Sequence, residues 1–226
     1  MSLNAPVLRG VDLADRLDRH PAQDTELVFE GMVWDVRRDV IDLGAAGEVT
    51  REYVDHPGAV SIVALRQVDG GDQLLLIQQY RHPVGSFEWE LPAGLLDIEG
   101  EQPWLCAARE LHEEADLSAG RWDVLIDYFS SPGGNSEALR VFLARDLGDV
   151  HHRDLFTREG EEHAMPVGWV DLDEAHEAVL RGQLHNPGAV IGILTAHASR
   201  ARGWATLRPC DSPWPEHPLW HGGIGS

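Results

Sequence analysis

Three glutamates lie close enough together in the sequence to hold a divalent cation. Glu110 and Glu114 are four residues apart and Glu113 flanks them, so in a helix they project from one side. Like charges at this spacing destabilise a helix by roughly 0.2–0.5 kcal/mol per pair. A bound cation would turn that repulsion into ligation, and carboxylate oxygens suit Mg²⁺ or Mn²⁺. A solvated acidic helix face is the alternative interpretation of the same residues.

The one cation within this cluster is Arg109. It precedes Glu113 by four residues, a spacing at which opposite charges pair on a helix. Glu110 and Glu114 have no cation three or four residues away. We therefore expect these two carboxylates to need an external positive charge.

A helix must carry the carboxylates, and the flanking residues predict its ends. It begins near Glu101–Pro103, because proline is favoured at the first helical position, and it continues through WLCAARELHEEA. Asp116 follows at the position where a left-handed residue closes a helix, a conformation that Asp tolerates. The apolar stripe expected to face the core consists of Trp104, Ala107, Ala108, Leu111 and Ala115.

The rest of the chain predicts many strands and a few interspersed helices, which is typical of an α+β or mixed-sheet domain. A loop is expected over 81–94, and helices over 171–181 and from an Asn186 cap onwards. The expected strands are 26–43 with a bulge at Gly31, 49–54, 58–68, 73–80, 122–129, 138–145 and 165–170.

Three segments follow from this pattern. Residues 1–57 form a strand-rich N-terminal segment, and residues 58–203 form the central domain that contains the acidic helix. Residues 204–226 are rich in Trp, Pro, Gly and His, and we expect them to form an extended arm.

The composition limits the classes of partner. The 226 residues include 38 Asp plus Glu against 18 arginines and no lysine, a net charge of −20. Such a charge argues against nucleic-acid backbones and anionic membranes, and no window of about 18 apolar residues predicts a membrane span. The N-terminus lacks a secretory signal. Cys106 and Cys210 lie far apart in the sequence and match no metal-ligand spacing. We therefore expect no disulfide framework, which fits a reducing, cytoplasmic setting.

The segment Gly94–Leu117 resembles the Nudix box, G-x5-E-x7-R-E-U-x-E-E-x-G-U, where U is apolar. Residues 109–114, RELHEE, match its core, and Glu101 precedes them at the spacing of the motif. Two positions depart from it. Six residues rather than five separate Gly94 from Glu101, and Asp116 replaces the last glycine. Neither change removes a carboxylate.

The resemblance extends over roughly residues 26–200, and this part of the chain is similar to the ADP-ribose pyrophosphatase branch of the family. It is carried by LPAG, by QQYRHPV before it, by SPGGNSE after the box and by VTREYVDHPGAV near the N-terminus. It implies an α/β/α sandwich with a mixed sheet, an N-terminal β-rich subdomain and a homodimer. The implied reaction is hydrolysis of ADP-ribose, a small molecule, to AMP and ribose 5-phosphate with Mg²⁺ or Mn²⁺.

The resemblance also implies which residues hold the metal. Gly94, Glu101 and Arg109 are expected to orient the box. The implied ligands are the main-chain carbonyl of Ala93 and the carboxylates of Glu110 and Glu114, with Glu113 close by.

A glutamate in a loop after the box supplies the general base in this branch. The matching stretch is Arg158–His163, in which Glu161 is the first choice and Glu162 and Glu159 are alternatives. A carboxylate on a hinged loop can approach the attacking water when substrate is present. A plain acidic surface loop is the competing interpretation.

Contacts to substrate are implied at five further positions. Arg81 corresponds to a phosphate contact, and Glu137 to a contact with the terminal ribose. Arg51 and Glu52 correspond to residues at the adenine end, and Trp34 could stack on adenine or belong to a core or interface.

Other functions stay open at this point. The box specifies diphosphate hydrolysis, so another nucleoside diphosphate sugar or a dinucleotide is an alternative substrate. A non-catalytic sensor of ADP-ribose is another class, but the carboxylates are intact and the chain has no basic helix-turn-helix segment. An acidic metal buffer is disfavoured because no calcium-loop pattern is present.

Overall fold

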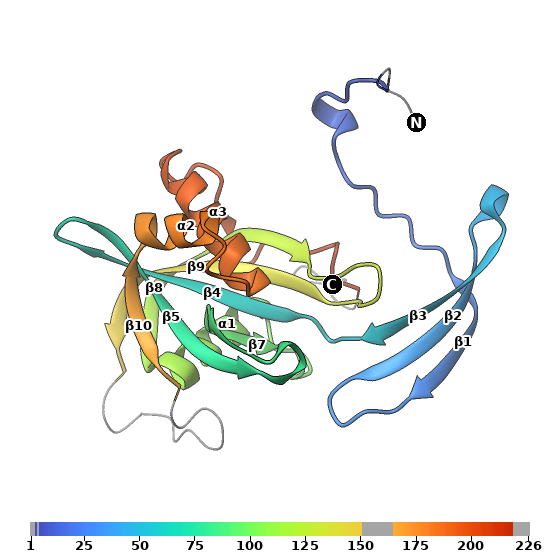
Figure 1. The fold of residues 1–226 in the computed structure, drawn as a ribbon, viewed down its shortest axis with the longest axis horizontal. Helices are drawn as coiled ribbons and strands as arrows, with labels where there is room; N and C mark the ends of the chain where they lie inside the picture. The colour runs from blue at the N-terminus through green and yellow to red at the C-terminus, as the bar shows by residue number, and fades with distance from the viewer. Residues whose placement is uncertain (1–2, 4, 151–164, 219–226) are drawn as a thin grey trace. The chain divides into compact units, whose positions relative to one another are not determined.

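The computed structural model describes residues 3, 5–150 and 165–218, and Figure 1 shows their strands and helices. The chain divides into two compact units, Met1–Tyr53 and Val54–Ser226. Within the described ranges, none of the helices has the length and apolar character that crossing a membrane requires.

The first unit is built on a three-stranded sheet of order β1-β2-β3. Its strands are β1 (Ala22–Phe29), β2 (Asp35–Asp42) and β3 (Glu48–Asp55). β1 and β2 are antiparallel. Two short 3-10 helices, Gly10–Asp12 and Gly44–Ala46, accompany the sheet.

The prediction of one strand over 26–43 was wrong, because the chain reverses between β1 and β2. The amide of Gly31 donates to Asp35 Oδ1 over 3.3 Å. A Cβ on Gly31 would lie 2.0 Å from the carbonyl oxygen of Trp34. Gly31 therefore permits a close backbone approach in a turn, and it is not a bulge within a continuous strand.

The second unit is built on an eight-stranded mixed sheet of order β10-β5-β4-β9-β8-β11, with β6 beside β5 and β7 beside β4. β4 and β9 are parallel, whereas β5 and β8 run antiparallel to their neighbours β4 and β9. The strands are β4 (Ala59–Val68), β5 (Gly71–Arg81), β6 (Ser86–Glu90), β7 (Ala93–Leu95), β8 (Leu117–Phe129), β9 (Ala138–Asp149), β10 (Val167–Asp171) and β11 (Arg208–Pro209).

Within the ranges that the structure describes, three α-helices flank this sheet, and their ends agree with the predicted caps. They are α1 (Pro103–Ala115), α2 (Leu172–Leu180) and α3 (Pro187–Arg200). The Asn186 side chain accepts from the amide of Ala189 over 3.0 Å, and proline occupies the first turns of α1 and α3. These helices begin where the sequence predicts because caps and proline act locally.

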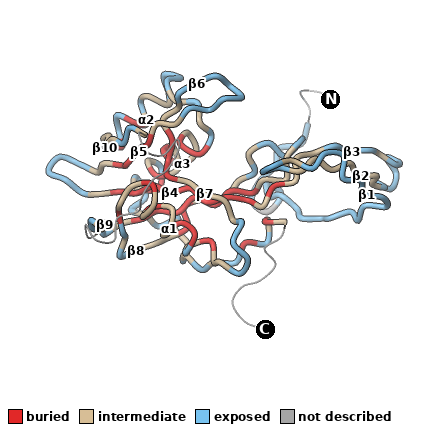
Figure 2. Tube along the Cα trace, turned by 90° about the horizontal axis from the view of Figure 1, so that it is seen from below, coloured by how far each residue is buried: buried red, intermediate tan, exposed pale blue. Residues whose placement is uncertain are grey.

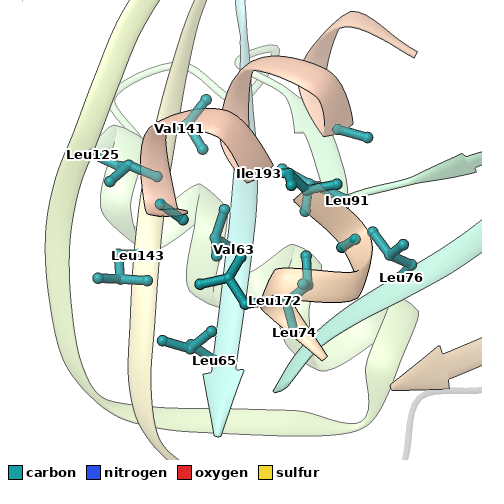
Figure 3. Close-up of a cluster of buried hydrophobic side chains, with 13 residues drawn as sticks. Val63, Leu65, Leu74, Leu76, Leu91, Leu125, Val141, Leu143, Leu172 and Ile193 are labelled. Carbon is teal, nitrogen blue, oxygen red and sulfur yellow. The ribbon is translucent and has the colours of Figure 1, made fainter. Parts of the chain in front are cut away.

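Alternating side chains of β4 supply both faces of the sheet. Val63 and Leu65 join the core beneath α2 and α3 (Figure 3). Val60, Ile62 and Ala64 join the core beneath α1, and Figure 2 shows β4 buried along most of its length. A strand apolar on both faces must be covered twice, so the second unit is the predicted α/β/α sandwich.

The loop predicted over 81–94 was wrong, because it contains β6 and β7. A short 3-10 helix, His82–Val84, and Gly85 at φ 64° reverse the chain after β5. Phe87 then pairs with Tyr80 across the strands, with ring centroids 5.1 Å apart. The alternation of Phe87 and Trp89 with acidic residues is a strand signal, although the Gly and Pro around it favour a loop.

The expectation of an extended C-terminal arm was also wrong for the described part of that segment. β11 pairs with β8, and both Trp214 and His217 are 2% exposed. Arg140 is 1% exposed and donates to the carbonyls of Ser212 and Pro213 over 2.7 and 3.1 Å. A buried guanidinium needs acceptors on every side, and the end of the chain supplies two of them.

Candidate active site

Two residues of strand β7, Ala93 and Gly94, form the centre of the candidate site together with helix α1. β7 pairs with β4, where Ala93 is opposite Ser61 and Gly94 is opposite Val60. α1 packs on the same part of the sheet through its buried residues Ala107 and Leu111, as the predicted stripe requires. Ala108 is only partly buried, and Cys106 takes a core position that the stripe omitted.

The carboxylate of Glu110 lies directly against Gly94. A Cβ on Gly94 would be 2.1 Å from Glu110 Cδ and 2.1 Å from its Oε1. Arg109 Nη1 donates to the same oxygen over 2.5 Å. The expectation that Glu110 lacks a cationic neighbour was therefore wrong, because a long arginine side chain can reach its own neighbour in sequence although their Cβ atoms diverge.

Glu114 is held on Ala93, the neighbouring residue of β7. Its Oε2 accepts from the amide of Ala93 over 3.0 Å. The side chain of Glu110 is 13% exposed and Glu114 is 9% exposed. The interpretation of α1 as a solvated acidic face was therefore wrong, since both carboxylates are largely removed from solvent.

Arg109 joins the acidic residues of the box. It forms two hydrogen bonds to Glu101, of 3.0 and 2.9 Å, and a longer ion pair of 3.4 Å to Glu113. The hydrogen bonds to Glu101 raise the pKa of Arg109, and in return Arg109 lowers the pKa of Glu101. Both groups therefore stay charged, and the segment just before α1 is tied to the second turn of the helix.

Both departures from the box motif are accommodated in the backbone. The extra residue before Glu101 falls in a turn in which the Glu101 amide donates to the Ile98 carbonyl over 3.1 Å. Gly100 in that turn adopts φ 78°. Asp116 closes α1 at φ 54° and ψ 33°, the left-handed conformation that the sequence predicts.

Glu90 is a polar residue of the site that the sequence analysis did not single out. It is 3% exposed and accepts two hydrogen bonds of 2.7 Å from Arg81. These bonds are the main cause of the raised pKa of Arg81, and the charge of Glu114 adds to it. Arg81 therefore lies near both Glu90 and the box. The two residues lie on neighbouring strands of the β5–β6 hairpin, but its register pairs Arg81 with Ser86 and Glu90 with Ile77, so strand pairing alone would not have suggested the contact.

Glu137 lies just before β9, after the Ser-Pro-Gly-Gly turn. Ser130 Oγ donates to Glu137 Oε2, and the Asn135 side chain accepts from the amide of Glu137 over 2.9 Å. His56 Nε2 is 3.3 Å from Glu137 Oε1. Three neighbours thus fix this residue, and His56 is a second residue that the sequence analysis did not single out.

Three predicted substrate contacts belong to the first unit. Trp34 follows the turn at Gly31 and is 36% exposed. Arg51 Nη1 donates to the carbonyl of Thr50 over 2.9 Å. Glu52 Oε1 accepts from Arg38 Nε and Nη2 over 2.8 and 2.6 Å, so its charge is already paired within that sheet.

The donor set suits a hard cation, although the carboxylates are not gathered into a formed cage. Among the described residues, no three or more His, Cys, Asp or Glu side chains are arranged as a metal-binding group. Glu110, Glu114 and the Ala93 carbonyl nevertheless offer only oxygen ligands, which Mg²⁺ and Mn²⁺ prefer. All of them lie at residues 93–94 of β7 or contact them. The predicted bases Glu159, Glu161 and Glu162 lie outside the described residues.

Comparison with known proteins identifies the family. Residues 55–189 match the NUDIX domain family. The ADP-ribose pyrophosphatase of Mycobacterium tuberculosis (strain ATCC 25618 / H37Rv) is 42% identical over 194 residues, covering 86% of this chain and 90% of that protein. The ADP-ribose pyrophosphatase of Bacillus subtilis (strain 168) is 34% identical over 169 residues, covering 74% and 87%.

A solved structure shares the fold. The crystal structure of an ADP compounds hydrolase superposes on this chain with a TM-score of 0.66 at 22% identity, covering 85% of this chain and 99% of the other. The matched domain, residues 55–189, includes the whole of helix α1 and the strand β7 that contacts it. The chain therefore belongs to the Nudix family, as the segment Gly94–Leu117 predicts.

Proposed function

We propose that this protein hydrolyses the diphosphate bond of ADP-ribose to AMP and ribose 5-phosphate. The contact of Glu110 with Gly94 and of Glu114 with Ala93, both in strand β7, is the observation that carries the proposal, because it fixes two largely buried carboxylates against adjacent main-chain residues. The relatives named ADP-ribose pyrophosphatase support the choice of substrate, since the alignments cover nearly their whole length.

Nudix hydrolases generally use divalent metal ions, and we assign Mg²⁺ or Mn²⁺ to this site. Glu110, Glu114 and the Ala93 carbonyl would hold the ion, with Glu113 close by. When bound, the ion neutralises negative charge on the diphosphate oxygens. Gly94, Glu101 and Arg109 keep the carboxylates in place, because each touches Glu110 or the residue that does.

The remaining roles fall to side chains that bind substrate or move a proton. Arg81, oriented by Glu90, binds a phosphate oxygen. Glu137 accepts hydrogen bonds from hydroxyl groups of the terminal ribose. Glu161 takes the proton of the attacking water as its oxygen bonds to phosphorus and the P–O–P bridge breaks, with Glu162 and Glu159 as alternative bases.

We assign Trp34, Arg51 and Glu52 to the adenine end of the substrate, within one protomer or across the dimer. Trp34 offers a partly exposed indole for stacking. Arg51 and Glu52 would contact the adenine. Glu52 already accepts two hydrogen bonds from Arg38 through Oε1.

A substrate panel tests the proposal. ADP-ribose, ADP-glucose, NADH and a diadenosine compound are each incubated with Mg²⁺, with Mn²⁺ and with EDTA, and the phosphomonoester products are measured. We expect the largest kcat/KM for ADP-ribose and no product with EDTA. A larger value for ADP-glucose would assign the enzyme to another nucleoside diphosphate sugar. Binding of ADP-ribose without any product would favour the non-catalytic sensor.

We also infer that the protein is a homodimer. β1 and the turn after it expose six large apolar side chains, namely Leu27, Val28, Phe29, Met32, Val33 and Trp34. A contiguous run of this kind is typical of an interaction surface, and we assign a second copy of the chain to it. Light scattering of the Phe29→Glu variant should then report half the mass of the unaltered protein.

We place the protein in the cytoplasm. Cys106 and Cys210, the two cysteines of the chain, are both free thiols. Free thiols are typical of a reducing compartment. Fractionation of cells that express the protein would test this assignment.

A further inference from the structure

His56 is a buried histidine whose two ring nitrogens have different partners. Its side chain is 6% exposed. Nδ1 accepts from the amide of Gly58 over 3.0 Å, so the proton of the neutral ring resides on Nε2. That nitrogen faces Glu137 Oε1 at 3.3 Å. The ring therefore links the turn before β4 to the carboxylate that we assign to the ribose.

The neighbours of this histidine keep it neutral. Burial lowers the pKa of His56, and the charges of Glu137 and Asp55 oppose that effect without cancelling it. A second proton could be placed only on Nδ1, where the Gly58 amide already points. His56 therefore stays neutral near neutral pH, with its Nε2 nitrogen 3.3 Å from Glu137 Oε1.

The turn that holds His56 is covered by the end of the chain. His217 Nε2 lies 2.9 Å from the carbonyl oxygen of Pro57. Gly58 adopts φ 90°, and a Cβ there would be 2.1 Å from the same nitrogen. His217 therefore occupies the space that any larger residue at position 58 would need.

The C-terminal segment is itself anchored to the sheet. Trp214 packs on His217, with ring centroids 4.7 Å apart, and on the Arg140 guanidinium, 4.6 Å from its ring centroid. Arg140 also forms two hydrogen bonds to Asp127, of 2.8 and 3.0 Å. A series of contacts thus leads from the middle of the sheet through the chain end to the His56 turn.

We propose that His56 is a positioning residue for Glu137, and that the segment Ser212–His217 fixes the turn from which His56 acts. The inference rests on the proposed function, because it takes the terminal ribose as the ligand of Glu137. It assigns a role in the active site to a part of the chain outside the 55–189 match to the family.

Nuclear magnetic resonance of the ligand-free protein tests the geometry without any reference to activity. The ring nitrogens of ¹⁵N-labelled His56 should report a proton on Nε2 and none on Nδ1 at neutral pH. Glu137→Gln should shift the Nε2 signal. A proton on Nδ1, or an Nε2 signal that does not respond to Glu137→Gln, would overturn the inference even if the enzyme hydrolyses ADP-ribose.

Kinetics test the consequence. His56→Ala should raise KM for ADP-ribose by about tenfold, as expected for the loss of one polar contact with a charged group, and should leave kcat nearly unchanged. His56→Gln, which retains a donor, should recover part of the loss. The double variant with Glu137→Gln should bind no more weakly than Glu137→Gln alone. Additive effects would show that His56 acts elsewhere.

Variants of the chain end separate positioning from folding. His217→Ala should raise KM for ADP-ribose and move the His56 Nε2 signal while the melting temperature shows a folded protein. Asp211→Asn, an exposed neighbour, is the matched control and should change neither. An unchanged His56 signal in a folded His217→Ala protein would remove the C-terminal segment from the proposal. If the unaltered protein does not hydrolyse ADP-ribose, the proposed function fails while the resonance measurements still decide the geometry.

Discussion

The Cα of Gly94 lies against the carboxylate of Glu110, so that no side chain fits between strand β7 and helix α1. A Cβ at this position would be 2.1 Å from Glu110 Cδ. Both atoms belong to groups tied to their surroundings, since Gly94 is paired with Val60 in the sheet and Glu110 is bound by Arg109. Contact of this kind explains why a glycine is required before the acidic helix.

Replacing that glycine should displace the carboxylate. We expect Gly94→Ala to lower kcat/KM for ADP-ribose by at least about 10²-fold, because a shift of one ångström in a catalytic group costs that much. Steady-state kinetics and Mn²⁺ calorimetry measure the effect. Gly120→Ala is the control, since a Cβ there meets only ordinary contacts of 3.4–3.6 Å. Equal activity in both variants would contradict the role of Gly94.

Glu114→Gln should abolish turnover and leave the fold intact. The amide oxygen of glutamine can still accept from the amide of Ala93, whereas its charge is gone. Circular dichroism checks the fold and calorimetry checks Mn²⁺ uptake. The exposed Glu99→Gln is the control for the loss of one negative charge. Near-normal activity of Glu114→Gln would remove this residue from the metal site.

Glu90→Gln should weaken substrate binding through Arg81. The substitution removes the charge that holds the guanidinium in a bidentate pair, and we expect KM to rise by about tenfold. Glu88→Gln, on the same strand, keeps that pair and serves as the control. If KM is unchanged in Glu90→Gln, the orientation of Arg81 does not matter for the substrate.

Glu161→Gln should lower kcat by about 10²-fold or more if this residue is the general base. The pH profile of kcat should lose its acidic limb in the same variant. Parallel measurements on Glu162→Gln and Glu159→Gln identify the base by the size of the loss. A larger effect in Glu162→Gln would move the assignment by one residue.

Cys106 should make the protein less stable in alkali. Burial, ahead of the charges of Glu110 and Glu101, raises the pKa of its thiol to about 12, compared with 9.0 for a free thiol. Between these pH values the unfolded chain loses the proton and the folded chain keeps it, so the free energy of unfolding falls as the pH rises. Urea denaturation at pH 8 and pH 10 should show a smaller loss for Cys106→Ala. An equal loss would show that the thiol does not titrate differently on folding.

Local patterns carried the parts of the fold that the sequence predicted correctly. The start of α1 at Pro103, the left-handed Asp116 and the Asn186 cap depend on residues within one helical turn. The strand β4 likewise follows from a run of apolar residues from Ala59 to Leu65 that only Ser61 interrupts. The four-residue spacing of Glu110 and Glu114 also predicted correctly that both side chains lie on one side of α1, where they contact Gly94 and Ala93.

Features that depend on distant residues were not predictable in this way. The chain reverses at Gly31 because its Cα approaches the Trp34 carbonyl, and a strand-like composition hides this. The pairs of Arg81 with Glu90 and of His56 with Glu137 form only after strands have paired. Trp214 is buried in part because the guanidinium of Arg140, on strand β9, packs against its ring. Nothing in the sequence near Trp214 indicates that partner.

The contact between Pro57 and His217 joins positions that are 160 residues apart. A ribosome releases the His56 turn long before it has synthesised the tryptophan and histidine that cover it. Closure of long loops is slow compared with local folding. During synthesis, the Arg140 guanidinium therefore lacks two of its acceptors, the carbonyls of Ser212 and Pro213, until that segment has been made. Completion of this domain during biosynthesis is thus coupled to arrival of its final segment, and ribosome-stalled chains ending before Ser212 should be more sensitive to protease than released ones.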